Sequence, residues 1–341
     1  MASATIIGEQ ERPLETTTGE GLDQRYVVDL ASISTDSLVL PATRFYVRTG
    51  YPDLGDPDAG RIAIGGLADS AELLIADLVD EAAELGPIYM ECSGNSSYGG
   101  FGLMSAATAR GIPMSTVLDR LVAQPGATAV RVDGHDEHST TSSSSQPGAS
   151  WVFPIDTLRE GYLLVELDGQ PLRPEHGFPA RLWLPHWWGC ACIKWVREMV
   201  FVDDTEPATS QMTEFAIRTE QTTVPALARD FLPATRDPAA VLTRAELWRS
   251  GGEDWWRLVG LYWGPEVPDE EWRVRIGPSS EIPVSTCLAR PSPWTWGLWE
   301  AWAQDLSGDL DVSLFLDNSP VPTRRLDRGY YTRTVRFDAT R

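Results

Sequence analysis

The sequence predicts an α+β protein whose C-terminal part is built from β-strands alone. Between residues 61 and 202, short alternating apolar runs are mixed with stretches of helical spacing, without the strict alternation of a doubly wound sheet. Beyond residue 238, short β-like runs lie between Pro and Gly turns. Regularly spaced strands of this kind are typical of a sandwich of roughly 100 residues.

The elements expected in the first part follow from local patterns. Residues 67–85 place Leu74, Leu78 and Leu85 at helical spacing ahead of the stop Gly86-Pro87, so we expect a helix there. Apolar alternation and turn residues predict the others: strands at 62–64, 87–92, 128–132, 162–167, 181–185 and 193–202, a helix at 114–122, and loops at 93–100 and 139–145.

Composition divides the chain into four segments. Residues 1–25 are polar and are expected to form an extended arm, and residues 26–205 hold the mixed pattern of a first domain. The polar, Pro-containing stretch 206–238 is interpreted as a linker. Residues 239–341 form the predicted sandwich, with strands at 258–263, 272–276, 310–315 and 332–337.

Charge and composition exclude several classes of protein. The 341 residues carry 28 Lys and Arg against 49 Asp and Glu, a net charge of −21, which disfavours tight binding to nucleic acid or anionic lipid. Apolar residues make up 42%, enough for a full core, yet no run approaches the roughly 20 apolar residues of a membrane-spanning helix. With no secretory signal visible, we expect a soluble, cytoplasmic protein.

The cysteines, histidines and the single lysine are the first candidates for chemistry. Cys92, Cys190, Cys192 and Cys287 are too scattered for a disulfide scaffold, and no Cys/His pattern has zinc-finger or haem-attachment spacing. Lys194 is the one lysine among 28 basic residues, so a specific role for it is worth testing.

Cys92 ends an apolar strand and opens a loop of small residues, so its sulfur can face a cavity. Three interpretations stay open on spacing alone. The thiol can be an ordinary buried cysteine, a nucleophile with His176 or His138 as its base, or a soft ligand to a metal or metal cofactor.

Five sequence blocks stand out, and they lie at Phe45–Arg48, Cys92–Asn95, Leu163–Leu172, His176–Arg181 and Lys194-Trp195. They resemble the patterns F-x-V-R, C-A-G-N, L-L-A-Y-x-x-N-G-x-P-L, H-G-x-P-x-R and K-W of the sulfite oxidase family of molybdopterin enzymes, in that family's order and at nearly its spacing. The resemblance covers residues 25–205. A weaker one, at Trp294–Trp299, is to the immunoglobulin-like dimerisation domain of that family.

The resemblance implies a sulfite-oxidase-type molybdopterin-binding domain followed by an immunoglobulin-like β-sandwich. It implies a molybdenum–molybdopterin cofactor (Moco) whose metal is bound by Cys92. It also implies that Cys92 and Arg48 are the catalytic residues. The positions that match the family's cofactor contacts are Phe45, Arg48, Cys92, Asp136, His176, Arg181 and Lys194. Cationic contacts suit the anionic cofactor, because a phosphate held by an acidic chain needs local positive charge.

The sequence departs from the sulfite-oxidising members where their substrate pocket is cationic. Ser97 and Gly297 stand where the family has arginines, Val165 replaces a tyrosine, Gly50 replaces a histidine, and Ala109 replaces a tryptophan. A sulfite dianion in a half-buried pocket requires compensating charge. We therefore expect oxygen-atom transfer on a substrate larger and less anionic than sulfite.

Partners and alternatives complete the hypothesis. No haem or flavin motif is visible, so a separate electron carrier is expected beside the small-molecule substrate, and a homodimer is expected from the C-terminal resemblance. Two other functions remain: a molybdopterin-binding protein without catalysis, and a metal-free thiol enzyme that uses Cys92 and His176.

Overall fold

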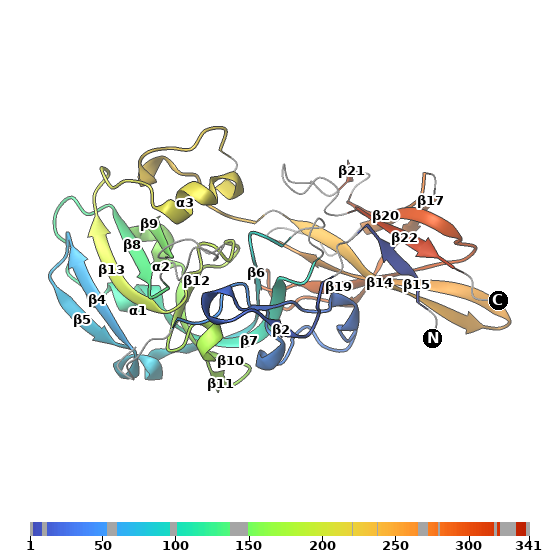
Figure 1. Cartoon of the computed structure of the whole chain (residues 1–341), viewed down its shortest axis with the longest axis horizontal. Helices are drawn as coiled ribbons and strands as arrows, with labels where there is room; N and C mark the ends of the chain where they lie inside the picture. The colour runs from blue at the N-terminus through green and yellow to red at the C-terminus, as the bar shows by residue number, and fades with distance from the viewer. Residues whose placement is uncertain are drawn as a thin grey trace.

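The computed structural model describes residues 3–8, 12–52, 60–95, 101–136, 149–219, 221–236, 238–264, 272–278, 280–316, 319–320 and 332–338. The chain forms two parts that lie side by side along the long axis (Figure 1). Each part is built around a pair of β-sheets, and the α-helices are short: α1 (Met114–Leu118), α2 (Ile155–Arg159) and α3 (Ser210–Glu214). The fold is therefore mostly β, with fewer and shorter helices than the predicted α+β class implies. No helix in the described ranges has the length and apolar character needed to cross a bilayer.

The first sheet of the N-terminal part carries the strand that leads to Cys92. Its strands are antiparallel, in the order β11 (Gln170–Pro171), β10 (Tyr162–Leu167), β7 (Met104–Pro113) and β6 (Ala83–Glu91), and β12 (Arg181–Trp183) also pairs with β10. Leu163, Leu164 and Val165 of β10 are all buried, because both faces of this sheet are covered.

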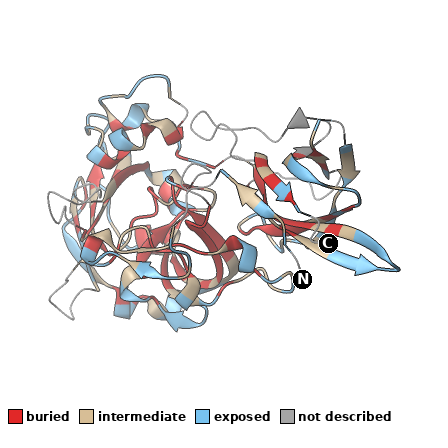
Figure 2. Cartoon of the chain, turned by 45° about the vertical axis from the view of Figure 1, so that its right-hand side comes forward, coloured by how far each residue is buried: buried red, intermediate tan, exposed pale blue. Residues whose placement is uncertain are grey.

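The second sheet packs on one face of the first. Its order is β5 (Ala71–Leu74), β4 (Arg61–Gly66), β13 (Val196–Val202), β8 (Ala129–Gly134) and β9 (Ser150–Pro154), with β13 and β4 parallel. Ile62, Val130 and Met199 from this sheet share a core with Leu163 of β10. Figure 2 shows the resulting buried interior of the N-terminal part in red.

The predicted helix at 67–85 is wrong. Residues 71–74 form β5, which pairs with β4, and residues 75–77 and 79–81 are single 3-10 turns that lead into β6. A 3-10 turn has a period of three, so it brings Ile75 and Leu78 to the same buried side. That spacing imitates the apolar stripe of an α-helix in the sequence. Helix α1 is also shorter than the predicted 114–122.

The C-terminal part consists of two antiparallel sheets packed face to face. One has the order β14 (Ala239–Ser250), β15 (Glu253–Trp263), β19 (Gly297–Ala303) and β18 (Ser285–Leu288). The other has the order β1 (Thr5–Ile7), β22 (Thr332–Phe337), β20 (Gly308–Leu316), β16 (Trp272–Ile276) and β17 (Ser280–Pro283), with β21 (Ser319–Pro320) beside β20. Phe337 packs its ring 5.0 Å from Trp256 across the two sheets.

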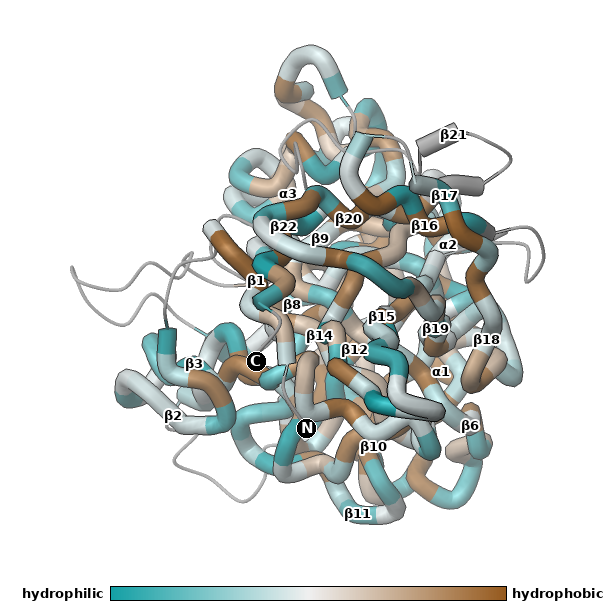
Figure 3. The backbone as a smooth tube through the Cα atoms, turned by 90° about the vertical axis from the view of Figure 1, so that its right-hand side faces the viewer, coloured by the Kyte–Doolittle hydropathy of each residue, from teal (hydrophilic) through white to brown (hydrophobic). Residues whose placement is uncertain are grey.

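The N-terminal residues divide between the two parts of the molecule. Strand β1 pairs with β22, so the start of the described chain belongs to the C-terminal sheet, as the side view of Figure 3 shows. The chain then returns, and β2 (Thr17–Thr18) pairs with β3 (Arg25–Tyr26) beside the first sheet.

One core joins the two parts. The free face of the first sheet, the segment 27–46 and the sandwich contribute to a single buried cluster. The Tyr89 amide of β6 donates to the Trp294 carbonyl at 2.8 Å, and the Trp296 indole donates to the Leu38 carbonyl at 2.7 Å. The Trp263 indole donates to the buried carboxylate of Glu91 at 3.0 Å. The sandwich therefore contacts the residue that precedes Cys92.

The close packing around Gly260 in the sandwich predicts that adding one methyl group there lowers the stability of the protein. A Cβ at Gly260 of β15 would overlap the Val241 carbonyl oxygen and the Trp299 ring. We expect Gly260→Ala to destabilise the protein by about 2 kcal/mol, because overpacking a close-packed core forces the backbone to shift. Gly65→Ala in β4, where nothing lies within 4 Å, is the control and should change stability little. Urea denaturation measures both, and equal stability of the two variants would contradict the packing described.

Candidate cofactor site

The Cys92 sulfur lies at the wall of a cavity of about 180 Å³. Backbone contacts hold it: the Cys92 amide donates to the Leu103 carbonyl at 2.9 Å, and the Gly94 amide points at Sγ at 3.3 Å. The fully buried Asn95 side chain accepts from the amides of Gly102 and Leu103 at 3.1 Å each and donates to Glu91 at 3.2 Å. Residues 92–95 are thus held in place by contacts within the protein.

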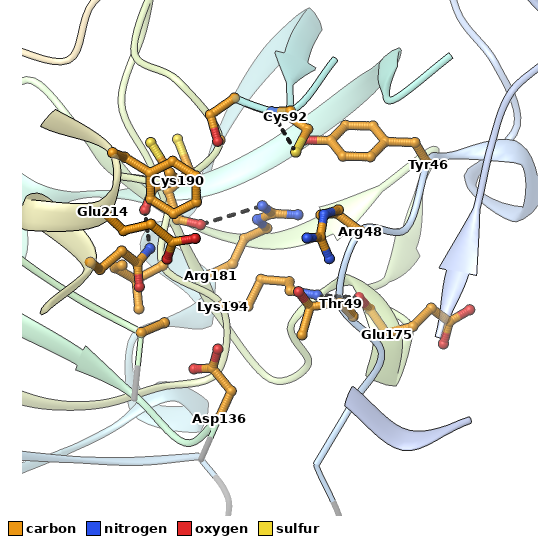
Figure 4. A pocket seen from close by; sticks show the side chains of 18 residues that line it. Tyr46, Arg48, Thr49, Cys92, Asp136, Glu175, Arg181, Cys190, Lys194 and Glu214 are labelled. Atoms are coloured by element: carbon orange, nitrogen blue, oxygen red, sulfur yellow. Dashed lines mark hydrogen bonds between the residues drawn. The ribbon is translucent and has the colours of Figure 1, made fainter. Parts of the chain in front are cut away.

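Gly189 allows the opposite wall to come close to this loop. A Cβ at position 189 would lie 2.9 Å from both the Glu91 carbonyl oxygen and the Tyr46 hydroxyl. Because glycine stands there, the Tyr46 hydroxyl can lie beside Cys92, as Figure 4 shows. Burial and the neighbouring Cys92 raise the pKa of Tyr46, so its hydroxyl keeps its proton.

Three cationic side chains face the middle of the cavity. The guanidinium groups of Arg48 and Arg181 lie between Cys92 and Lys194 in Figure 4. The Lys194 ammonium donates to the carbonyls of Thr49 and of Glu175, the latter at 3.0 Å. Burial, helped by the charge of Arg181, lowers the pKa of Lys194, and burial also lowers that of Arg181.

Two buried polar atoms of this wall have no hydrogen-bonding partner among the described residues. Nε of Arg181, a residue 5% exposed, makes no hydrogen bond, and its terminal nitrogens reach only the His176 and Cys192 carbonyls at 3.4 Å. Oδ1 of Asp136 makes none either. Burial raises the pKa of Asp136, against the opposing effect of Lys194. Buried polar groups left unsatisfied in this way indicate that a polar ligand completes the site.

The structure thus brings five of the seven sequence-predicted residues together, and two lie elsewhere. Cys92, Arg48, Asp136, Arg181 and Lys194 line the cavity.

Phe45 and His176 do not line it. Their rings pack edge to face with centroids 5.5 Å apart, and Nε2 of His176 contacts the Ala42 carbonyl at 3.1 Å. His176 instead supports Arg181 through its backbone carbonyl. The described part of the lining contains no histidine, so no Cys–His pair forms there; His138 lies outside the described residues.

Several lining residues were not anticipated from the sequence. Gln211, Glu214 and Phe215 come from α3 and the residue after it, within the stretch interpreted as a linker. Thr209 caps that helix by accepting from the Met212 amide at 3.2 Å, a signal visible in the sequence. The others are Tyr46, Thr49, Ser93, Gly94, Ala149, Glu175, Gly189, Cys190, Cys192 and Ile193.

The thiols beside Cys92 do not make a protein metal cage. Burial raises the pKa values of Cys190 and Cys192, which therefore stay protonated. The described residues hold no group of three His, Cys, Asp or Glu side chains arranged for a metal ion. A metal bound through Cys92 must therefore bring most of its other ligands with it, as a metal cofactor does.

Comparisons with known proteins agree with this site. Residues 49–210, just under half of the chain, match the family model described as an oxidoreductase molybdopterin binding domain. Nitrate reductase (NADH) 1 of Oryza sativa subsp. japonica is 28% identical over 193 residues, which is 50% of this chain and 21% of that protein. Nitrate reductase (NADH) 2 of Phaseolus vulgaris is 33% identical over 113 residues, 30% of this chain and 13% of that protein.

A solved structure extends the likeness to the whole fold. The sulfane dehydrogenase SoxCD from Paracoccus pantotrophus superposes with a TM-score of 0.69 over 93% of this chain and 85% of that chain, at 18% identity. At that identity the likeness is one of fold. The curated nitrate reductases are longer proteins, of which the matched region spans about a fifth or less.

Fold, cavity and family match together define a molybdopterin-binding oxidoreductase domain. Over residues 49–210 the chain carries this oxidoreductase molybdopterin binding domain, in agreement with the resemblance of its sequence to the sulfite oxidase family of molybdopterin enzymes. The predictions of family, enzyme class and molybdopterin cofactor are confirmed at the level of this domain.

Burial of His176 predicts a pH-dependent stability. Burial, with help from Arg181 and Lys194, lowers the pKa of His176 from 6.5 to about 4, so the unfolded chain binds a proton that the folded chain rejects. The stabilisation is complete above pH 6.5 and is lost as the pH falls towards 4, by at most about 3 kcal/mol. His176→Gln, which can still donate to the Ala42 carbonyl, should flatten this slope. Urea midpoints at pH 7, 6 and 5 test it, and identical slopes in both proteins would refute it.

Proposed function

We propose that this protein is a molybdenum-cofactor oxidoreductase that performs oxygen-atom transfer on a substrate larger and less anionic than sulfite. The single observation that carries the proposal is the cavity in which Cys92 faces Arg48, Arg181 and Lys194. The unpartnered Nε of Arg181 and Oδ1 of Asp136 fit the cofactor: one is a donor for an oxyanion, and the other an acceptor for the N–H groups of a pterin.

The roles of the residues follow from their chemistry. When bound, the cofactor supplies two-electron redox chemistry coupled to oxygen transfer. Cys92 would hold the metal by its thiolate, on a loop that Asn95 and Glu91 keep in place. Arg48, Arg181 and Lys194 would bind the anionic groups of the cofactor. His176 lies behind this wall, where its carbonyl accepts from Arg181 and its ring packs against Phe45.

The charge of the cavity supports a substrate that is less anionic than sulfite. Three cations line it, and three carboxylates do so as well: Asp136, Glu175 and Glu214. Once the cations bind the cofactor, the remaining wall offers the Glu214 carboxylate, Gln211 and the Phe215 ring. A dianion there would be buried without compensating charge.

Packing at positions 297 and 165, where the sequence differs from the sulfite-oxidising members, also supports a substrate less anionic than sulfite. A side chain at position 297 would overlap the Tyr262 ring, so that the place of the family's arginine is filled. Val165 is buried in the core between the two N-terminal sheets. Ser97 lies outside the described residues.

The wider organisation belongs to the same proposal. We propose that the chain divides at residues 25, 205 and 238, that residues 239–341 form an immunoglobulin-like sandwich, and that this sandwich supports a homodimer. A separate electron carrier and a cytoplasmic location complete it. The two packed antiparallel sheets support the sandwich assignment.

Replacing the metal-binding thiol should separate folding from chemistry. We expect Cys92→Ser to keep the melting temperature within about 2 °C, because the loop is held by backbone contacts and Asn95. Turnover with an artificial electron acceptor or donor should be lost. Cys287→Ser, on β18 and away from the cavity, is the matched control and should keep full activity. Elemental analysis for molybdenum accompanies the assay. Wild-type turnover by the Ser variant would overturn the proposal.

The carboxylate of Glu214 tests the charge argument. Removing one negative charge from the cavity wall should improve the binding of an anion by about 1 kcal/mol, or about fivefold. We therefore expect Glu214→Gln to bind sulfate about five times more tightly than wild type in a calorimetric titration. Glu72→Gln is the control: it removes a carboxylate of strand β5 that pairs with Arg61 of β4, outside the cavity. We expect it to leave the sulfate affinity unchanged. Equal sulfate affinities in all three proteins would contradict the proposal that the Glu214 carboxylate disfavours anionic substrates.

A further inference from the structure

A second site lies at the junction of the two parts, behind the wall of the cavity. After α3, residues 234–236 pair with residues 186–188 before the chain enters β14 of the sandwich. Trp187 and Thr235 form an antiparallel bridge, and the Arg236 amide donates to the His186 carbonyl at 2.7 Å. These contacts fix Arg236 beside His186.

Arg236 is buried without a hydrogen-bonding partner in the part of the chain that the structure describes. The residue is 2% exposed, and Nε and both terminal nitrogens make no hydrogen bond to any of those residues. No carboxylate among the described residues pairs with it. The face of the guanidinium lies over the Tyr89 ring, 3.7 Å from its centroid, and this contact stabilises the charge. The N–H groups point outward in the plane of the guanidinium, so stacking leaves them unsatisfied.

The surroundings of Arg236 add positive charge and a further polar atom. Nδ1 of His186 is also buried and unpartnered. Burial, with the charges of Arg236 and Arg290, lowers the pKa of His186 to about 4, so the imidazole is neutral at pH 7 and can present an N–H. The charge of Arg236 is felt at Tyr46 and Cys192, which line the cavity, whereas Arg236 itself does not line it.

We propose that Arg236 and His186 form a binding site for a small planar oxyanion, such as a carboxylate or nitrate, at the junction of the two parts. The fork of the guanidinium matches the two oxygens of such an anion, and the Nδ1 hydrogen of His186 offers a third donor. The site is separate from the cavity cations Arg48, Arg181 and Lys194, and it does not rest on the proposed function.

Thermal stability measures this binding directly, because a ligand that binds only the folded state raises the melting temperature. The protein isolated with its cofactor is melted in sodium nitrate and, separately, in sodium formate, from 0 to 200 mM, together with Arg236→Met. We expect each salt to raise the wild-type melting temperature by at least about 3 °C more than that of Arg236→Met. General salt effects cancel in this difference. A larger response to formate identifies a carboxylate ligand, and a larger response to nitrate an inorganic one.

Two further variants and one measurement on wild type make the test decisive. Arg110→Met removes an arginine already paired with Glu166 and should keep the anion response of wild type. Arg236→Lys keeps the positive charge but loses the paired N–H groups of the guanidinium. Its melting temperature should therefore rise less with added anion than that of wild type. If the Met variant does not fold, wild-type crystals soaked in sodium bromide replace it, and an anomalous peak beside the Arg236 guanidinium is expected. Equal responses in wild type and Arg236→Met, or no such peak, would overturn the proposal.

Discussion

The buried carboxylate of Glu91 is the contact on which the candidate site depends. It accepts one hydrogen bond from the Trp263 indole of the sandwich and another from the Asn95 side-chain amide, which follows β6. Burying a carboxylate is unfavourable unless hydrogen bonds satisfy it, so both donors are required. The position of Cys92, between Glu91 and Asn95, is consequently set by the C-terminal sheets as well as by its own. The two parts of the protein form one structural unit around this residue.

A second constraint is the balance of charge inside the cavity. Arg181 is buried and Lys194 is largely so, and among the described residues their charged ends donate hydrogen bonds to carbonyl oxygens. Such an arrangement costs free energy unless an anion is present. Asp136 and Glu175 reduce that cost in part. The acidic chain therefore keeps its single lysine at a position where an anionic group is needed to complete the structure.

The sequence indicated the strands more reliably than the helices. The strands at 162–167, 272–276 and 332–337 were predicted with their observed bounds, because β-branched and aromatic runs ended in clear turns. The helix at 67–85 failed because successive 3-10 turns reproduce helical spacing. Four cavity residues, Arg48, Cys92, Arg181 and Lys194, belong to the motifs, and Asp136 was expected from the family resemblance. Glu214 belongs to no motif, and only the path of the chain after β13 brings it to the cavity. Phe45 and His176 match the motif but lie behind the cavity wall.

The pairing of β1 with β22 has a consequence for how the protein is made. More than 300 residues separate these two strands, so their ladder is among the last contacts that a growing chain can form. Until then the backbone groups on the outer side of β22 are open to any other extended peptide. A cleaved chain that lacks residues 5–7 would leave that side of β22 unpaired, and an unpaired strand edge of this kind favours self-association.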